Sequence, residues 1–159
     1  TLLYKIKEYR YAIENSQSVA IHVRRGDYLN HPEMYGMSCT TEYYRAGVHY
    51  IRERHPDAKF FVFTNDPVWT AKWLQENFLG DFTLIQGTDE ETGYLDLMLM
   101  SQCKHQIMAN SSFSWWGAWL NSYKQKIITA PTPWFGDRDC RDIYTKEMIR
   151  ISPDGEVCR

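Results

Sequence analysis

Two adjacent arginines and a hydroxyl-rich segment are the residues of this sequence best suited to binding phosphate groups. Arg24 and Arg25 directly follow an apolar run, and residues 110–114 (NSSFS) lead into a segment with helical character. A helix start presents unpaired N–H groups and the positive end of its dipole, and serine hydroxyls add further donors. Arginine contributes planar, bidentate donors for phosphate oxygens. Together these groups suit a nucleotide that carries two phosphates.

Two carboxylates extend this interpretation to the sugar and the base of a nucleotide. Asp66 follows a second apolar run, where carboxylates commonly accept hydrogen bonds from ribose hydroxyls. Asp96 stands in a helical segment and would accept from a base that presents two N–H donors, as guanine does.

Each candidate also has a structural alternative, in which its side chain serves the fold rather than a ligand. The alternatives are an N-cap for Ser111, Ser112 and Asp66, ion pairs for Arg24 and Arg25, a core position for His22 and an exposed position for Asp96. The convergence of both arginines and the hydroxyl-rich helix start on one sheet edge favours the ligand. The sequence contains neither a Walker motif nor G-x-G-x-x-G, which excludes a P-loop or a dinucleotide-binding domain.

Short apolar runs alternate with segments of helical spacing along the chain. Strands are predicted at Ser18–Val23, Lys59–Thr64, Phe82–Gln86, His105–Ala109 and Lys126–Ala130, with a sixth near Met148–Ile151. Helices are predicted at Leu2–Glu14, Thr40–His55, Pro67–Asn77, Thr92–Cys103 and Ser112–Asn121.

This alternation predicts the α/β class, as a Rossmann-like three-layer sandwich in which helices cover both faces of a parallel sheet. Ligands of such sheets bind beyond the carboxyl ends of the strands. The candidate residues follow the first, second and fourth predicted strands, as this rule requires.

Length and composition indicate one soluble globular domain. The chain has 159 residues, of which 43% are hydrophobic and 15% aromatic, which excludes a disordered segment. Lys and Arg number 18 against 20 Asp and Glu, and this balance argues against a nucleic-acid-binding surface. No window approaches the roughly 20 apolar residues of a membrane span, and no signal peptide is recognisable at the start.

The cysteines favour free thiols in a reducing cytosol over a disulfide framework. The four are Cys39, Cys103, Cys140 and Cys158, with no C-x-x-C pair and no spacing typical of a zinc site. Cys103 lies among apolar residues and is expected to be a small core residue. No metal site is predicted.

Three tryptophans, Trp115, Trp116 and Trp119, resemble a membrane or stacking patch. Their helical spacing instead favours a core position, with at most one of them facing a partner.

Two motifs resemble those of a known enzyme family. His22–Tyr28 (HVRRGDY) and Asn110–Asn121 (NSSFSWWGAWLN) are similar to the strongest motifs of the α-1,2-fucosyltransferases, glycosyltransferase family eleven. Leu95–Ala109 and the Pro133-Trp134-Phe135 segment also resemble bacterial members of that family. The resemblance covers nearly the whole chain.

The resemblance implies an inverting transferase that moves L-fucose from GDP-β-L-fucose to a galactose in α-1,2 linkage, without a cofactor or an obligatory metal. It implies one lobe of a GT-B-like enzyme, with residues 1–159 as a single GDP-fucose-binding domain. Residues 1–16 would then lead from an N-terminal acceptor lobe that this sequence lacks, and the apolar face of that helix would be exposed. A chain of this length would bind the donor and catalyse transfer poorly.

The resemblance also implies roles for individual residues. His22 would lie near the guanine and ribose, Arg24 or Arg25 would hold the β-phosphate, and Asp96 would read the guanine edge. The residues that would line the phosphates and base are Asn110, Ser111, Ser112, Phe113 and Ser114. Related enzymes more often carry two acidic residues at the positions of Asn65 and Asp66. Which of these two positions, if either, contacts the ribose therefore stays open.

Fucosyl transfer builds negative charge on the leaving phosphate, so we assign Arg24 and Arg25 to stabilising that charge. An inverting reaction also needs a base for the acceptor hydroxyl. Asp27 and Glu33 are the nearby carboxylates, and Asp27 could instead form a salt bridge with Arg24. The absent lobe or the leaving phosphate are further alternatives for the base.

Two other functions stay open. One is a relative with another linkage or another GDP-sugar, and the other is a nucleotide-sugar-binding module without catalysis. The expected partners are GDP-fucose and a galactose-terminated glycan, with no nucleic acid. The expected location is the cytoplasm of a bacterium, with peripheral association at the inner membrane.

Overall fold

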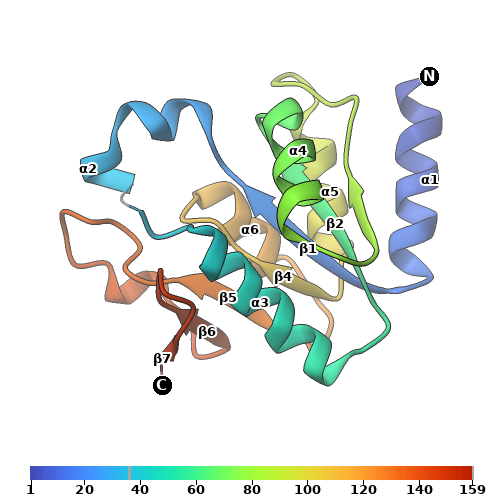
Figure 1. The fold of residues 1–159 in the computed structure, drawn as a ribbon. Helices are drawn as coiled ribbons and strands as arrows, with labels where there is room; N and C mark the ends of the chain where they lie inside the picture. Colours follow the sequence, from blue (N-terminus) through green and yellow to red (C-terminus); the bar gives the residue numbers. More distant parts are fainter. Residues whose placement is uncertain (36, 159) are drawn as a thin grey trace.

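One sheet organises the computed structural model, which describes residues 1–35 and 37–158 (Figure 1). Within those residues, seven strands lie in the order β3-β2-β1-β4-β5-β6-β7. Their bounds are β1 Gln17–Val23, β2 Ala58–Thr64, β3 Phe82–Leu84, β4 His105–Ile107, β5 Ile128–Pro131, β6 Met148–Ile151 and β7 Val157–Cys158. Strands β1 to β6 are parallel, and β7 pairs antiparallel with β6. The strand order reverses between β1 and β4, and α/β sheets bind ligands beyond such a reversal.

Helices join the parallel strands. Their bounds are α1 Leu2–Glu14, η1 Gly26–Asn30, α2 Pro32–Tyr35, α3 Thr41–Arg54, α4 Pro67–Asn77, α5 Gly93–Gln102, α6 Ser112–Trp119 and η2 Arg141–Ile143. All five predicted helices and all six predicted strands are confirmed, with ends that differ by a few residues. Strand β7 and the short helices η1, α2 and η2 were not predicted, since they are too short to show a hydrophobic period.

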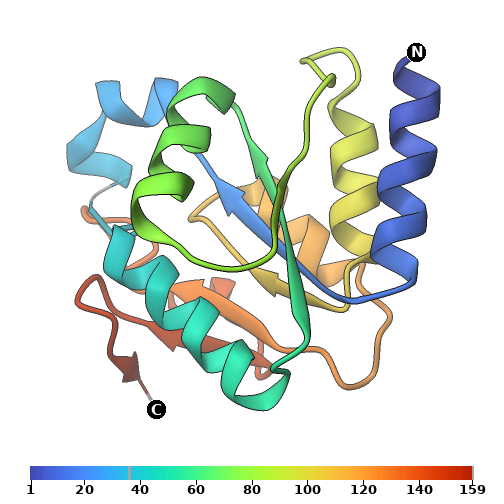
Figure 2. The same ribbon diagram turned by 45° about the vertical axis from the view of Figure 1, so that its right-hand side comes forward.

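Alternate residues of β1 point to opposite faces of the sheet, and each face packs against different helices. Val19 and Ile21 pack with buried residues of α3 and α4. Ala20 packs in a second cluster with α1 and α5. Figure 2 shows the sheet between these two groups of helices. The predicted three-layer α/β sandwich with a largely parallel sheet is therefore confirmed.

Helix α1 is part of this core. Ile6 and Ile13 are buried in the cluster that includes α5 and the second face of β2. Burial of these two residues contradicts the expectation that the apolar face of this helix is exposed. The large apolar residues of α1 that are exposed are Leu3, Tyr4 and Tyr11. The expectation that residues 1–16 lead from another lobe stays a prediction.

Helix α6 presents its smallest residues to the core. A Cβ atom at Gly117 would lie only 2.5 Å from Sδ of Met100 on α5, so the two helices pack closely there. Since this face of α6 is the buried one, Trp116 and Trp119 face outward and are 51% and 57% exposed. The prediction that at most one of the three tryptophans lies outside the core is therefore wrong, since two are exposed and Trp115 is half-buried.

All four cysteines are free thiols, as predicted. Cys103 is fully buried, and burial raises the pKa of its thiol. It is a small core residue rather than a nucleophile.

Candidate active site

A cleft of about 1110 Å³ opens at the carboxyl ends of β1, β2 and β3. Its polar lining includes His22, Arg24, Asn65 and Asp96, all four of which the sequence had marked. Apolar lining comes from Phe63, Pro67, Val68, Ala71, Ile85 and Phe113. A cleft with an apolar wall and a few convergent polar groups is typical of a small-molecule site.

His22, near the end of β1, forms the floor of the cleft and is held from two sides. Its Nδ1 lies 2.8 Å from Oγ of Ser114, and its backbone carbonyl accepts a hydrogen bond from Tyr44 Oη at 2.8 Å. Its ring lies 5.4 Å from that of Phe113. Burial, aided by the positive charge of Arg24, lowers the pKa of His22 to about 3. The imidazole is therefore neutral at physiological pH.

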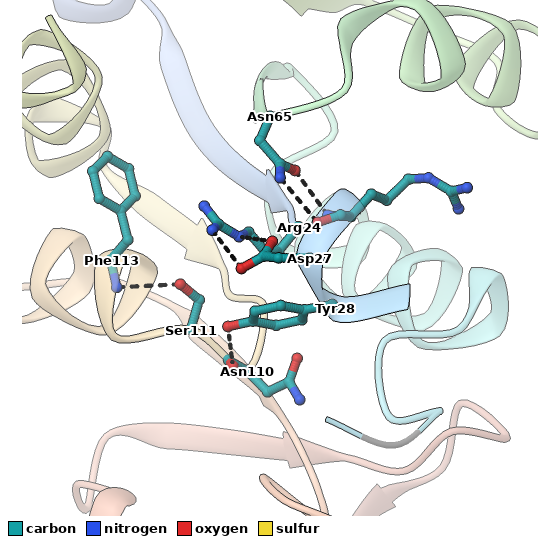
Figure 3. A network of polar contacts seen from close by, with 8 residues as sticks. Arg24, Asp27, Tyr28, Asn65, Asn110, Ser111 and Phe113 are labelled. Atoms are coloured by element: carbon teal, nitrogen blue, oxygen red, sulfur yellow. Dashed lines mark hydrogen bonds and ion pairs between the residues drawn. The ribbon is translucent and has the colours of Figure 1, made fainter. Parts of the chain in front are cut away.

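Arg24 and Asp27 form a bidentate pair at the mouth of the cleft (Figure 3). Nε and Nη2 of Arg24 donate to the two carboxylate oxygens of Asp27 at 3.1 and 2.9 Å. The hydrogen bond from Arg24 lowers the pKa of Asp27. A carboxylate with both oxygens engaged and a lowered pKa is a weak proton acceptor. The salt-bridge alternative for Asp27 is thus the one present in the structure.

Arg25 points away from the cleft. Its guanidinium carbon lies 3.6 Å from the ring centre of Trp69 on α4, and its Nε is 3.6 Å from Oδ2 of Asp66. Asp66 also caps α4, because its Oδ1 accepts from the Trp69 backbone N–H at 3.2 Å. Neither Arg25 nor Asp66 is part of the cleft lining.

Asn65 connects β2 to the loop after β1. Its Oδ1 accepts from the Arg25 N–H at 2.8 Å, and its Nδ2 donates to the Arg25 carbonyl at 2.9 Å. The loop turns at Gly26, whose φ of +67° is disfavoured for residues with a side chain. Both polar atoms of the Asn65 amide are therefore used in holding the loop.

The segment before α6 is held by hydrogen bonds within itself and to two residues distant in sequence, Trp134 and Tyr28. Asn110 Nδ2 donates to the Trp134 carbonyl at 2.9 Å, and its carbonyl accepts from Tyr28 Oη at 3.0 Å (Figure 3). Ser111 caps α6 by accepting from the Phe113 N–H at 3.2 Å. Ser114 is buried, and its Oγ bonds to the backbone N–H and carbonyl of Ala109. Ser112 is exposed at the first turn of the helix.

Asp96, on the first turn of α5, has one oxygen in use and one without a partner. Its Oδ2 accepts from Thr88 Oγ1 at 3.0 Å. Its Oδ1 is buried and, among the described residues, has no hydrogen-bond partner. Desolvation raises the pKa of Asp96, against the lowering effect of the Thr88 hydrogen bond. A buried carboxylate oxygen with no donor is costly unless a ligand supplies one.

The sequence did not mark Tyr28, Tyr44 or Thr88 as site residues. Tyr28 is the last residue of the HVRRGDY motif, and this position could have marked it as a site residue. Tyr44 and Thr88 reach the site only through tertiary packing, and no local pattern indicates them. Glu33 is exposed on α2 and lies 3.5 Å from His31.

Within residues 1–35 and 37–158, no cluster of His, Cys, Asp or Glu is placed to hold a metal ion. In the same residues, every helix is too short or too polar to cross a bilayer.

The family model described as Glycosyl transferase family 11 matches residues 4–152. An alpha-1,2-colitosyltransferase from Escherichia coli is 44% identical over 152 residues, covering 91% of this chain and 51% of its own length. The O-antigen biosynthesis glycosyltransferase WbnK from Escherichia coli is 35% identical, covering 87% of this chain and 46% of its own. The human galactoside alpha-(1,2)-fucosyltransferase 1 is 36% identical, covering 64% of this chain and 28% of its own. The chain thus spans about half or less of the length of these relatives.

Proposed function

Since the chain belongs to glycosyl transferase family 11, we propose that it forms the donor-binding lobe of a GT-B-like, inverting fucosyltransferase. The proposed reaction transfers L-fucose from GDP-β-L-fucose to a galactoside in α-1,2 linkage. The relatives are about twice as long, so acceptor binding and full activity are assigned to the remainder of such a protein.

The buried, unpaired Oδ1 of Asp96 is the observation that carries the choice of a guanine nucleotide. Guanine presents two N–H donors on one edge, and a carboxylate in an apolar cleft matches them. Uracil offers a single N–H, flanked by carbonyl oxygens that a carboxylate would repel. A guanine base would supply the donor that Oδ1 lacks, which offsets the cost of burying it.

Arg24 is the proposed partner of the leaving phosphate. Of the two adjacent arginines, it is the one whose side chain lines the cleft, while Arg25 is engaged with Trp69 and Asp66. Departure of GDP builds negative charge on the β-phosphate, and a fixed guanidinium stabilises that charge more in the transition state than in the ground state. Neutral His22 contributes a hydrogen bond rather than a charge.

Asp27 is proposed to position Arg24 and not to deprotonate the acceptor. Its two oxygens already accept from Arg24, and its pKa is lowered. The base is then Glu33, a group of the remaining lobe or the leaving phosphate itself.

The α-1,2 linkage and the galactoside acceptor are proposed from the names of the relatives. A colitosyl donor is a second candidate, favoured by the 44% identity to the alpha-1,2-colitosyltransferase. Colitose is L-fucose without its 3-hydroxyl, so the two donors differ at a single position. A cytoplasmic location, with contact to the inner membrane, stays a prediction.

Calorimetric titration with GDP, GDP-fucose and UDP tests the donor assignment. We expect GDP and GDP-fucose to bind and UDP not to bind. Asp96→Asn should lose most of the GDP affinity, whereas Asp154→Asn should keep it, because that carboxylate is exposed and does not line the cleft. Absence of GDP binding by the unmodified chain would contradict the proposal.

Product analysis with lactose as acceptor then separates an enzyme from a binding module. GDP-fucose and GDP-colitose are supplied in parallel, and the preferred donor is the one with the higher kcat/KM. The assay is run both on this chain and on a full-length relative as the positive control. GDP binding without product from either donor would support the module.

A further inference from the structure

A second hollow lies at the amino ends of strands β5 and β6, whereas the donor cleft opens at the carboxyl ends of β1, β2 and β3. It has a volume of about 460 Å³, within the range of small-molecule pockets. Ile128 and Met148, the first residues of β5 and β6, and Trp119, the last residue of α6, form part of its lining. The remaining lining residues are Ala118, Lys126, Thr145, Lys146 and Glu147. We refer to this hollow as the Trp119 pocket.

Trp119 presents a fixed, flat surface at the pocket. Its ring is stacked on that of Trp115, with centroids 5.3 Å apart and planes 9° apart. Trp115 is itself held, because its Nε1 donates to the Ile143 carbonyl at 2.8 Å. Trp119 is nevertheless 57% exposed. This exposure shows that much of the Trp119 ring stays open despite the stack on Trp115.

Polar groups stand around this surface. Nζ of Lys126 donates to the Asn121 carbonyl at 2.8 Å and lies 3.6 Å from Oε2 of Glu147. Oγ1 of Thr145 is buried and, among the described residues, has no hydrogen-bond partner. The pocket therefore combines an aromatic platform with a cation, a carboxylate and a hydroxyl that lacks a partner.

We propose that the Trp119 pocket binds a pyranose unit of a glycan chain. A pyranose has an apolar face of C–H groups, which packs on an open aromatic ring, and equatorial hydroxyls, which both donate and accept. A carboxylate, an ammonium and a hydroxyl around one tryptophan match this pattern. The inference rests on the proposed function, in which the acceptor is a glycan. It adds a site remote from the donor cleft, where a long acceptor chain is held.

The polar lining favours a sugar over a membrane surface. An anionic bilayer is attracted by unpaired basic groups around apolar residues. Of the two lysines in the lining, Lys126 is paired with Glu147, so Lys146 alone adds a net positive charge, fewer than the cluster of basic groups that holds a protein at an anionic surface. The tryptophan also borders a hollow with a buried hydroxyl.

Indole N–H resonances in a ¹⁵N spectrum test the proposal during titration with lactose and with lacto-N-neotetraose. The Trp119 signal is assigned by its loss in Trp119→Phe. We expect it to shift on addition of the sugars. The affinity for the sugars, measured by calorimetry so that no signal of residue 119 is needed, should fall at least several-fold in Trp119→Ala and Thr145→Val. Trp116→Ala is the matched control, since Trp116 is 51% exposed but does not line the pocket. An unmoved Trp119 signal with both sugars would overturn the proposal.

Two further measurements separate this site from the donor cleft and from a membrane surface. Asp96→Asn should lose GDP binding and keep the sugar-induced shift, whereas Trp119→Ala should keep GDP binding and lose the sugar binding that calorimetry detects. Sedimentation with phosphatidylglycerol vesicles is the second measurement. Vesicle binding that falls equally in Trp116→Ala and Trp119→Ala, with no sugar-induced shift, would assign this face to a membrane and overturn the proposal.

Discussion

The side chain of Asn65 forms two hydrogen bonds to the backbone of one residue, Arg25. Its amide oxygen accepts from the Arg25 N–H at 2.8 Å, and its amide nitrogen donates to the Arg25 carbonyl at 2.9 Å. Only an amide supplies both a donor and an acceptor in this geometry. The pair ties the end of β2 to the loop that carries Arg24, so it sets the position of a residue that lines the cleft.

Asn65→Asp should therefore loosen this loop. A carboxylate can still accept from the Arg25 N–H, but it repels the Arg25 carbonyl instead of donating to it. We expect a loss of about 1 kcal/mol in the free energy of unfolding and a several-fold weaker affinity for GDP, measured by urea denaturation and calorimetry. Gln75→Glu introduces the same charge at an exposed position on α4 and should change neither quantity. Equal effects of the two substitutions would show that charge alone is responsible.

The layers of the fold and the edge that holds the cleft were predictable from the sequence, because burial on both faces makes parallel strands continuously apolar. Ala20 and Ile21 belong to one such run, yet they pack against different helices. The candidate residues lie at the carboxyl edge because sheet topology leaves a crevice there. Both motifs reach that edge, as predicted.

The direction of individual side chains was not predictable in this way. Arg24 and Arg25 are adjacent, and Arg25 turns away to contact Trp69 on α4 and Asp66, two residues distant in sequence. Asn110 matched a ligand-binding motif but is used to hold the Trp134 segment. The exposed tryptophans of α6 failed as core predictions because the close approach of Gly117 to Met100 decides which face is buried. Such contacts join residues distant in sequence and leave no local pattern.

The two adjacent arginines should differ in their contribution to nucleotide binding. Arg24→Lys retains the charge but loses the bidentate geometry, and charged hydrogen bonds of this kind contribute about 1.5–3 kcal/mol each. We expect the GDP affinity to fall roughly tenfold or more for Arg24→Lys. Arg25→Lys, the matched substitution at the next position, should cause a smaller loss. Calorimetry with GDP decides this, and a larger loss for Arg25→Lys would reverse the assignment.

Stability should fall as the pH is lowered below about 6.5. Burial lowers the pKa of His22 to about 3 and that of His105 to about 4, below the ordinary value of 6.5. Between these values the unfolded chain binds more protons than the folded chain, so the stability from neutral histidines is present above pH 6.5 and lost toward acid. Each histidine adds up to about 1.4 kcal/mol per pH unit to the slope.

Urea denaturation between pH 4.5 and 7.5 measures this slope. His22→Gln should remove about half of the slope that His22 and His105 contribute together. His49→Gln is the control, since His49 is exposed on α3, and it should leave the slope intact. A flat profile in the unmodified chain would contradict the burial of both imidazoles.

The contact between α5 and α6 should be sensitive to one methyl group. A Cβ at Gly117 would lie 2.5 Å from Sδ and 2.9 Å from Cγ of Met100, which is itself buried. Gly117→Ala should destabilise the fold by about 1–3 kcal/mol through overpacking, despite the better helix propensity of alanine. Gly93→Ala is the comparison, because a Cβ there meets nothing within 4 Å, and it should be neutral or stabilising. Thermal denaturation of both variants measures the difference.

Asp96 should show opposite effects on stability and on binding. Desolvation raises the pKa of its carboxyl, so the folded chain pays for holding the ionised form at neutral pH. Because the pKa of Asp96 in the folded chain lies above its unfolded value, this carboxyl lowers the free energy of unfolding once the pH rises above about 4. Asp96→Asn removes that charge and keeps a group that can bond to Thr88. In the absence of nucleotide, we expect the variant to unfold at the same temperature as the unmodified chain or higher.

Saturating GDP should reverse this order. Ligand binding to the folded state raises the melting temperature by an amount that grows with the logarithm of the ligand concentration divided by Kd, and the unmodified chain should gain several degrees. Asp96→Asn should gain little, because an amide presents its acceptor to only one guanine N–H and sets its own donors against the other. Thermal scans of both proteins with and without GDP give the four values required. A variant that is less stable without nucleotide, yet equally stabilised by GDP, would show that Asp96 supports the fold and does not contact the base.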